Sequence, residues 1–165
     1  MTVTFKPPAL SRHQRQHNDI SVMVVDDSAV VRGIITRWLS LEGGINVIAS
    51  AANGKIAIEE AEKTQPDVII LDIEMPVMDG MAALPELRKI APKAQIIMAS
   101  TLTRRNADIS LKALQLGAVD YVTKPETRAA AATSSEFRRE IIQKVKAFAE
   151  NKVKKVDVDP KAALR

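Results

Sequence analysis

The stretch Val68-Ile69-Ile70-Leu71-Asp72-Ile73-Glu74-Met75-Pro76 decides the fold of this chain, because a continuous apolar run ends there in a carboxylate and then meets a proline. Continuous apolar strands are typical of parallel sheets that helices cover on both faces. We therefore expect a buried strand over residues 67–72. It would present Asp72 at its carboxyl end, where α/β sheets keep their binding sites.

Two other apolar runs end in charged residues in the same way. Residues 21–25 lead into Asp26 and Asp27, and residues 118–123 lead into Lys124 and Pro125. The carboxyl ends of parallel strands meet at one edge of a sheet. We expect three carboxylates and one ammonium group to converge there.

Short apolar runs alternate with amphipathic stretches along most of the chain, which is the pattern of strands joined by crossover helices. Strands are predicted at residues 20–26, 45–51, 67–72, 95–100 and 118–123. Helices are predicted near residues 28–41, 54–64, 80–90, 105–116 and 135–155. Because Pro85 falls inside the third helix, we expect that helix to start later than Gly80 or to bend.

Five such units predict an α/β fold of the flavodoxin-like (βα)5 type, a three-layer sandwich around a parallel five-stranded sheet. The strand order 2-1-3-4-5 suits five units of this length. Around this domain, which we place at residues 20–152, we expect a flexible N-terminal arm at 1–19. Residues 153–165 would form a tail or the start of a linker.

Composition limits the classes of function. The chain has 165 residues, 46% of them apolar, and no cysteine, so disulfides and thiolate metal sites are excluded and a cytoplasmic location is expected. The net charge of +4 sits in the ends, because residues 20–135 carry 12 basic against 14 acidic residues. No apolar run approaches the roughly 20 residues that span a bilayer. We expect neither a nucleic-acid nor a membrane partner.

The expected cluster of carboxylates needs a cation, since like charges at close range repel and raise a pKa. Mg²⁺ is suited to it, because this ion takes oxygen ligands and keeps waters or phosphate oxygens in its other positions. Both histidines, His13 and His17, fall in the arm, so we do not expect zinc. Each motif alone is more often a turn or a helix cap. Together they predict that Asp72 is a nucleophile for a phosphoryl group, beside Lys124 and the hydroxyl of Ser100 or Thr101.

Residues 24–28, the segment 71–80 and the segment 116–125 together resemble the receiver domain of bacterial two-component response regulators, over about residues 20–150. The resemblance implies that Asp72 is the phosphoacceptor and that Lys124 pairs with the phosphoryl group, with a cis bond to Pro125. It also implies a Mg²⁺ site and a switch. The site would use Asp27, Asp72 and the Glu74 backbone carbonyl directly and Asp26 through water; the switch would use Ser100 and Tyr121.

A narrower resemblance comes from Glu74 and the segments 98–103 and 137–147, which look like the receiver of a chemotaxis-type protein-glutamate methylesterase. It implies a chemotaxis-type histidine kinase as phosphoryl donor. The output would be a methylesterase domain or a chemoreceptor-linked protein. The loop after the fourth strand is longer than in single-domain chemotaxis receivers, so Thr101 competes with Ser100 for the switch role. No Gly-x-Ser-x-Gly elbow occurs, and esterase activity is not assigned to this chain.

Three alternatives to such a regulatory domain remain open: a stand-alone response regulator that acts through protein contacts, a small Mg²⁺-dependent aspartate phosphatase, and a docking module with an inert pocket. Phosphatases of the haloacid dehalogenase type place a second acid two residues after the nucleophile, and here that residue is Glu74. Ile73 and Pro76 fit no such motif. We expect Glu74 to modulate the lifetime of the phosphoryl group by crowding or repelling the attacking water.

Overall fold

A five-stranded parallel sheet forms the centre of the molecule, with the strand order β2-β1-β3-β4-β5. The structure is a computed structural model that describes residues 19–101 and 103–156. The predicted fold class and strand order are confirmed. The strands are β1 (Ile20–Val25), β2 (Ile45–Ala51), β3 (Val68–Asp72), β4 (Gln95–Thr101) and β5 (Asp120–Lys124).

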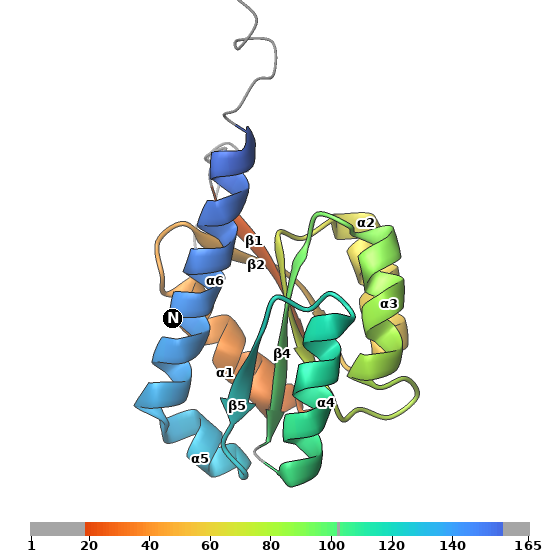
Figure 1. Ribbon diagram of the computed structural model, residues 1–165. Helices are drawn as coiled ribbons and strands as arrows, with labels where there is room; N and C mark the ends of the chain where they lie inside the picture. Colours follow the sequence, from red (N-terminus) through yellow and green to blue (C-terminus); the bar gives the residue numbers. More distant parts are fainter. Residues whose placement is uncertain (1–18, 102, 157–165) are drawn as a thin grey trace, which may run out of the picture.

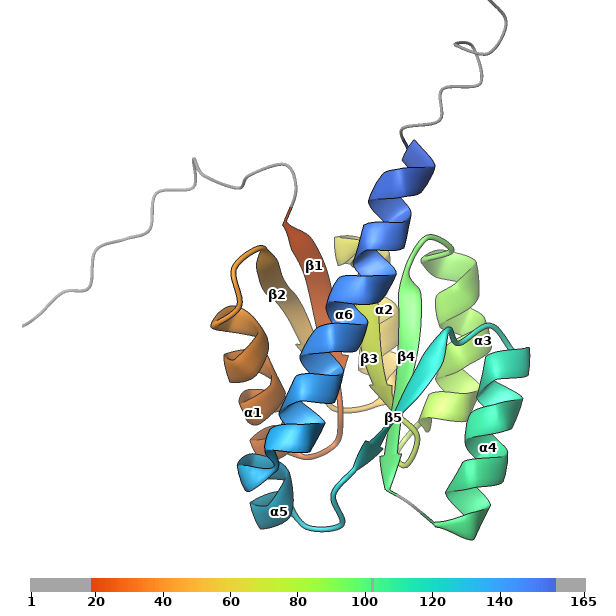
Figure 2. The same ribbon diagram turned by 60° about the vertical axis from the view of Figure 1, so that its left-hand side comes forward.

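Helices cover both faces of this sheet (Figures 1 and 2). One face carries α1 (Ala29–Ser40), α5 (Arg128–Thr133) and α6 (Ser135–Val156). The opposite face carries α2 (Gly54–Thr64), α3 (Gly80–Ile90) and α4 (Arg104–Gln115). These layers are the three-layer sandwich that the alternating sequence pattern predicted.

Strand β3 shows why the apolar run is continuous. All five of its residues are buried, and its side chains alternate between two hydrophobic cores. Val68 and Ile70 belong to the core under α1 and α6, whereas Ile69 and Leu71 belong to the core under α2 and α3. A central strand covered on both faces buries every side chain, so its sequence has no polar alternation.

Most helices begin where a short polar side chain can accept a hydrogen bond from the first turn. The Asp79 carboxylate accepts from the backbone N–H of Ala82 at 2.8 Å, so α3 begins at Gly80. The expectation of a later start was therefore wrong. Pro85 lies inside α3 without ending it. Because proline has no N–H, the carbonyl of Met81 loses the helical bond that it would otherwise accept.

The sequence pattern did not predict the short helix α5, which lies between β5 and α6. Thr127 caps it by accepting from the N–H of Ala130 at 3.0 Å, and Ala131 is buried against the core. Its six residues are too few to show a helical period. The predicted arm and tail fall mostly in residues 1–18 and 157–165, outside the described residues, although α6 runs on to Val156. None of the helices in the described ranges has the length and apolar character to cross a membrane.

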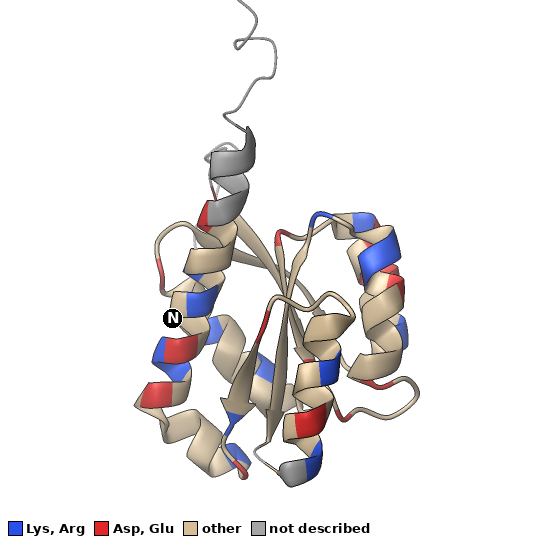
Figure 3. Cartoon of the chain, viewed as in Figure 1, with Lys and Arg blue, Asp and Glu red and all other residues tan. Residues whose placement is uncertain are grey.

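Charges of both signs are interleaved along the described part of α6, and both signs also occur on α2, α3 and α4 (Figure 3). A surface built to hold a nucleic-acid backbone concentrates basic residues on one face or along one helix. The expectation that this chain has no nucleic-acid partner stays a prediction.

The loop between β3 and α3 contains a strained turn. Val77 has a φ of 68°, and the N–H of Met78 donates to the carbonyl of Pro76 at 2.7 Å, which closes a three-residue turn. A β-branched residue is a genuine outlier at positive φ, and this type of turn is rare.

We expect Val77→Asn to raise the free energy of unfolding by about 1 kcal/mol, because asparagine tolerates positive φ and Val77 is 80% exposed. Urea unfolding would measure the change. Val30→Asn is the control, since it makes the same replacement at a half-exposed position within α1. A loss of stability at position 77 would contradict the assignment of strain.

Candidate functional site

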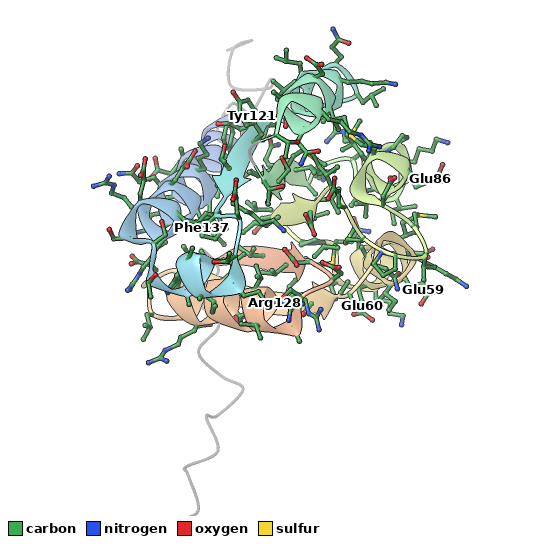
Figure 4. All side chains as sticks on the ribbon, turned by 90° about the horizontal axis from the view of Figure 1, so that it is seen from below. Glu59, Glu60, Glu86, Tyr121, Arg128 and Phe137 are labelled. Atoms are coloured by element: carbon green, nitrogen blue, oxygen red, sulfur yellow. The ribbon has the colours of Figure 1, made fainter. Side chains whose placement is uncertain are left out.

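The carboxyl ends of β1, β3 and β5 bring four charged side chains together, and Figure 4 views the molecule from this end. Asp26 and Asp27 follow β1, Asp72 ends β3, and Lys124 ends β5. Strands β1 and β3 are direct neighbours, while β5 lies beyond β4. The long Lys124 side chain spans that gap.

The three carboxylates form a compact cluster. One oxygen atom from each of Asp26, Asp27 and Asp72 lies within 4.8 Å of the other two. Asp26 and Asp72 are buried, whereas Asp27 is exposed at the mouth of the site. The cluster offers three oxygen atoms as metal ligands and is open to water on one side. It suits a hard divalent ion such as Mg²⁺, which needs one or two carboxylates and keeps waters in its remaining positions.

Lys124 joins two of these carboxylates. Its Nζ lies 2.8 Å from Asp26 Oδ2 and 3.0 Å from Asp72 Oδ1. Burial lowers the pKa of the Lys124 ammonium, but the charges of Asp72 and Asp26 and its hydrogen bonds to them outweigh this effect, so the pKa is raised overall. The group therefore stays positively charged.

For Asp72, burial is the effect that prevails. It raises the pKa of the Asp72 carboxyl from 3.8 to about 7, with Asp26 and Asp27 adding to the rise and Lys124 opposing it. The positive charge of Lys124 is thus too little to hold this carboxyl in its charged form well below neutral pH. A divalent cation would compete with the proton and favour the carboxylate.

Backbone contacts hold the acids in place. The N–H of Ser28 donates to Asp26 Oδ1 at 2.9 Å, and Arg32 Nη1 donates to the Asp26 carbonyl at 2.7 Å. On the other side, the N–H of Gly80 donates to the Ile73 carbonyl at 2.8 Å. A Cβ atom at Gly80 would overlap the backbone carbonyl oxygen of Asp72, so only glycine lets α3 start this close to β3.

The two hydroxyl residues at the end of β4 differ in their surroundings. Ser100 is buried and lies opposite Thr123, whereas Thr101 lies opposite Lys124. Thr101 lines the pocket that also contains Asp26, Asp27 and Lys124. Both residues line a second cavity, beside Tyr121.

Two other predicted site features lie in loops. Glu74 is exposed, two residues after Asp72, at the mouth of the site. The bond between Lys124 and Pro125 was expected to be cis, but none of the peptide bonds in the described ranges is cis, so that expectation was wrong.

Two residues at the site were not predicted from the sequence. Arg128 of α5 lines the pocket beside the acids (Figure 4), and six residues of α5 left no periodic signal. Asn106 of α4 is buried, and its amide donates to the carbonyl of Thr101 at 3.0 Å. The inward stripe of α4 carries Asn106 and Ser110 where apolar residues are usual, and this departure was a readable signal.

Comparison with known proteins gives a consistent result. The family model described as the response regulator receiver domain matches residues 22–134. A protein-glutamate methylesterase/protein-glutamine glutaminase from Paramagnetospirillum magneticum is 51% identical over 131 residues, which make up 79% of this chain and 34% of that protein. The chain thus spans about a third of the length of the curated relatives that it matches.

Two solved structures are also similar. The response regulator domain of Thermotoga maritima CheB has 37% identity and a TM-score of 0.70, with 80% of this chain and 97% of that chain covered. The CheX-CheY-BeF3-Mg²⁺ complex from Borrelia burgdorferi has 28% identity and a TM-score of 0.62, with 85% and 90% covered.

Proposed function

Because this chain belongs to the response regulator receiver domain family, we propose that it is a phosphorylation switch in which Asp72 accepts a phosphoryl group. One observation carries the proposal: the Lys124 ammonium bridges the buried Asp72 and Asp26 inside a cluster of three carboxylates. A structural ion pair needs only one carboxylate. A third acid beside it is useful where a divalent cation and an anion are to be bound together.

The acidic cluster fits Mg²⁺. Asp27, Asp72 and the backbone carbonyl of Glu74 would hold the ion, with Asp26 acting through water. When bound, the ion neutralises charge on the transferring phosphoryl oxygens and the attacking carboxylate. The similar complex from Borrelia burgdorferi, whose description includes BeF3 and Mg²⁺, supports this assignment.

The transfer itself is a displacement at phosphorus. A carboxylate oxygen of Asp72 forms the new bond to phosphorus as the bond to a histidine nitrogen of the kinase breaks, which leaves an acyl phosphate on Asp72. Lys124 lies close enough to Asp72 to move from that carboxylate to a phosphoryl oxygen.

We propose a chemotaxis-type histidine kinase as the donor and a cytoplasmic location, in line with the methylesterases that match this chain. The output would be a methylesterase domain or a chemoreceptor-linked protein. The alternative is a stand-alone regulator that acts by protein contacts. Esterase activity is not assigned to this chain, because the match covers the receiver region alone.

Phosphorylation would act through the residues that end β4. The added negative charge draws the hydroxyl of Ser100 or Thr101 toward the phosphoryl group, and Tyr121 changes its rotamer beside them. A pre-existing equilibrium of the surface formed by α4, β5 and α6 then shifts.

One experiment separates the switch from its rivals. Incubation with acetyl phosphate and Mg²⁺, followed by intact mass measurement, should add one phosphoryl group to the wild type. Asp72→Asn should add none, while the control Asp108→Asn, at an exposed position of α4, should behave as the wild type. Rapid multiple turnover would instead indicate a phosphatase, and the absence of an adduct would indicate an inert module.

We expect Glu74→Asn to shorten the half-life of the phosphoryl group about fivefold. The attacking water gains negative charge as it approaches the acyl phosphate, and an exposed carboxylate nearby repels that charge. Repulsion between two charges at close range in water is about 1 kcal/mol, which corresponds to a change in rate of about fivefold. Mass spectra taken at intervals after removal of acetyl phosphate would give the half-life. Glu59→Asn, on the outer side of α2 (Figure 4), is the matched control. An unchanged half-life at position 74 would count against a role for Glu74.

A further inference from the structure

A cavity of ≈ 170 Å³ lies beside the proposed phosphorylation site, between helix α4 and the strands β4 and β5. Helix α4 contributes two buried polar residues to its walls, Asn106 and Ser110. Its walls also include Ser100, Thr101 and Tyr121. A cavity of about 150 Å³ is large enough to take up a benzene ring.

Asn106 lines this cavity and carries a buried acceptor atom that no donor in the described part of the chain satisfies. Its Nδ2 donates to the carbonyl of Thr101 at 3.0 Å and to the Thr101 hydroxyl at 3.2 Å. Its Oδ1 is fully buried and has no hydrogen-bond partner among the described residues. A buried polar atom is nearly always satisfied, and leaving one unpaired costs free energy.

The orientation of this amide follows from its neighbours. A backbone carbonyl can only accept a hydrogen bond, so the NH₂ group of Asn106 must face Thr101 and the oxygen must face away from it. The Ser110 hydroxyl does not satisfy Oδ1, because it donates to the backbone carbonyl of Asn106 at 2.8 Å. The Oδ1 atom therefore needs a donor that is absent in this conformation.

Tyr121 carries a hydroxyl donor on the wall of the same cavity. It lines the cavity but is 42% exposed, and it lies between α4 and α6 in the view from the carboxyl end of the sheet (Figure 4). Lys144 of α6 holds it on the outside. The Lys144 Nζ lies 5.7 Å from the centre of the Tyr121 ring and donates to the Tyr121 carbonyl at 2.6 Å.

Lys144 is itself fixed in place. Its Nζ lies 3.0 Å from Glu140 and 3.3 Å from Asp120. A lysine ammonium within about 6 Å of a ring centre attracts the face of that ring. The outward position of Tyr121 thus has its own partner, separate from the cavity.

We propose that Asn106 Oδ1 accepts a hydrogen bond from the Tyr121 hydroxyl when the ring turns into the cavity, and that Lys144 stabilises the outward ring. The proposal deepens the proposed function and rests on it, because phosphorylation supplies the change beside Ser100 and Thr101 that favours the inward ring. Asn106 acts as a positioning residue. One amide would then contact both the end of β4 and the moving ring.

The chain contains one tyrosine, so replacement by 3-fluorotyrosine labels Tyr121 alone. The ¹⁹F resonance then reports the inward and outward populations. With acetyl phosphate and Mg²⁺ we expect the wild type to shift toward the inward signal. Asn106→Leu and Asn106→Ala should reduce the inward-to-outward ratio about threefold to tenfold, the range for one lost hydrogen bond. Mass measurement on the same samples shows whether Asp72 carries the phosphoryl group.

Lys144→Met provides a second test, which needs no phosphorylation. It should raise the inward population of the unmodified protein about threefold, and adding Asn106→Leu should remove that gain. An unchanged ratio in both Asn106 variants, in protein that carries the phosphoryl group, would overturn the inference and leave the proposed function standing. Wild-type protein without an adduct would overturn the proposed function. The Lys144→Met test would then decide the inference, because it needs no phosphorylation.

Discussion

Asp72→Asn should make the metal-free protein more stable than the wild type, by about 2 kcal/mol above pH 7. The buried Asp72 carboxyl has its pKa raised from 3.8 to about 7, which means that folding opposes its ionisation. Each pKa unit corresponds to about 1.4 kcal/mol, and the loss of one carboxylate partner of Lys124 offsets part of the gain. Asparagine fills the same space without a charge.

The gain should depend on pH in a defined way. The unfolded chain releases the Asp72 proton near the ordinary value of 3.8, whereas the folded protein retains it to about pH 7. Wild-type stability therefore falls as the pH rises through this window, and the difference from the variant grows from near zero at about pH 4 to a constant value above about pH 7. Asparagine does not titrate in this range, so position 72 adds no pH dependence to the stability of the variant.

Urea unfolding of both proteins between pH 4 and pH 8 in EDTA would measure this difference. Saturating Mg²⁺ should then stabilise the wild type by about 2.7 kcal/mol at 100 times Kd, and the variant much less, which reverses the order. Asp108→Asn, at an exposed position of α4, should change neither curve. A variant that is less stable than the wild type at pH 8 without Mg²⁺ would contradict the assignment.

Gly80→Ala should destabilise the fold by about 3 kcal/mol and slow phosphorylation by acetyl phosphate at least tenfold. The new Cβ would overlap the backbone carbonyl oxygen of Asp72, and a clash between backbone and Cβ cannot be relieved by a change of rotamer. Either α3 or the end of β3 must move. The hydrogen bond from Gly80 to Ile73 would be strained by the same shift.

Gly33→Ala is the matched control for this variant. Gly33 is exposed inside α1, and a Cβ there meets no atom within 4 Å. Alanine is the better helix former by about 1 kcal/mol, so this control should gain stability. Urea unfolding and the rate of adduct formation measure both effects. If Gly80→Ala kept the stability and the phosphorylation rate of the wild type, α3 would not need to lie this close to Asp72.

The architecture was predictable because its signals are local. The unbroken apolar run of β3, the acids after β1 and the polar caps each lie within a few neighbouring residues, and right-handed crossovers leave few ways to connect five such units. The predicted range of α3, residues 80–90, agrees with the observed helix, and only the alternative of a later start was wrong. Pro85 suggests a later start, but the Asp79 cap, which is also a local signal, starts the helix at Gly80.

The sequence by itself determined which residues meet at the carboxyl edge of the sheet, since strand ends and chain order place Asp26, Asp72 and Lys124 there. Only the tertiary structure decided how they interact. The double contact of Lys124, the raised pKa of Asp72 and the unpaired oxygen of Asn106 depend on distances and burial between segments far apart in the chain. Desolvation and hydrogen bonding are properties of packed atoms, and no sequence pattern carries them.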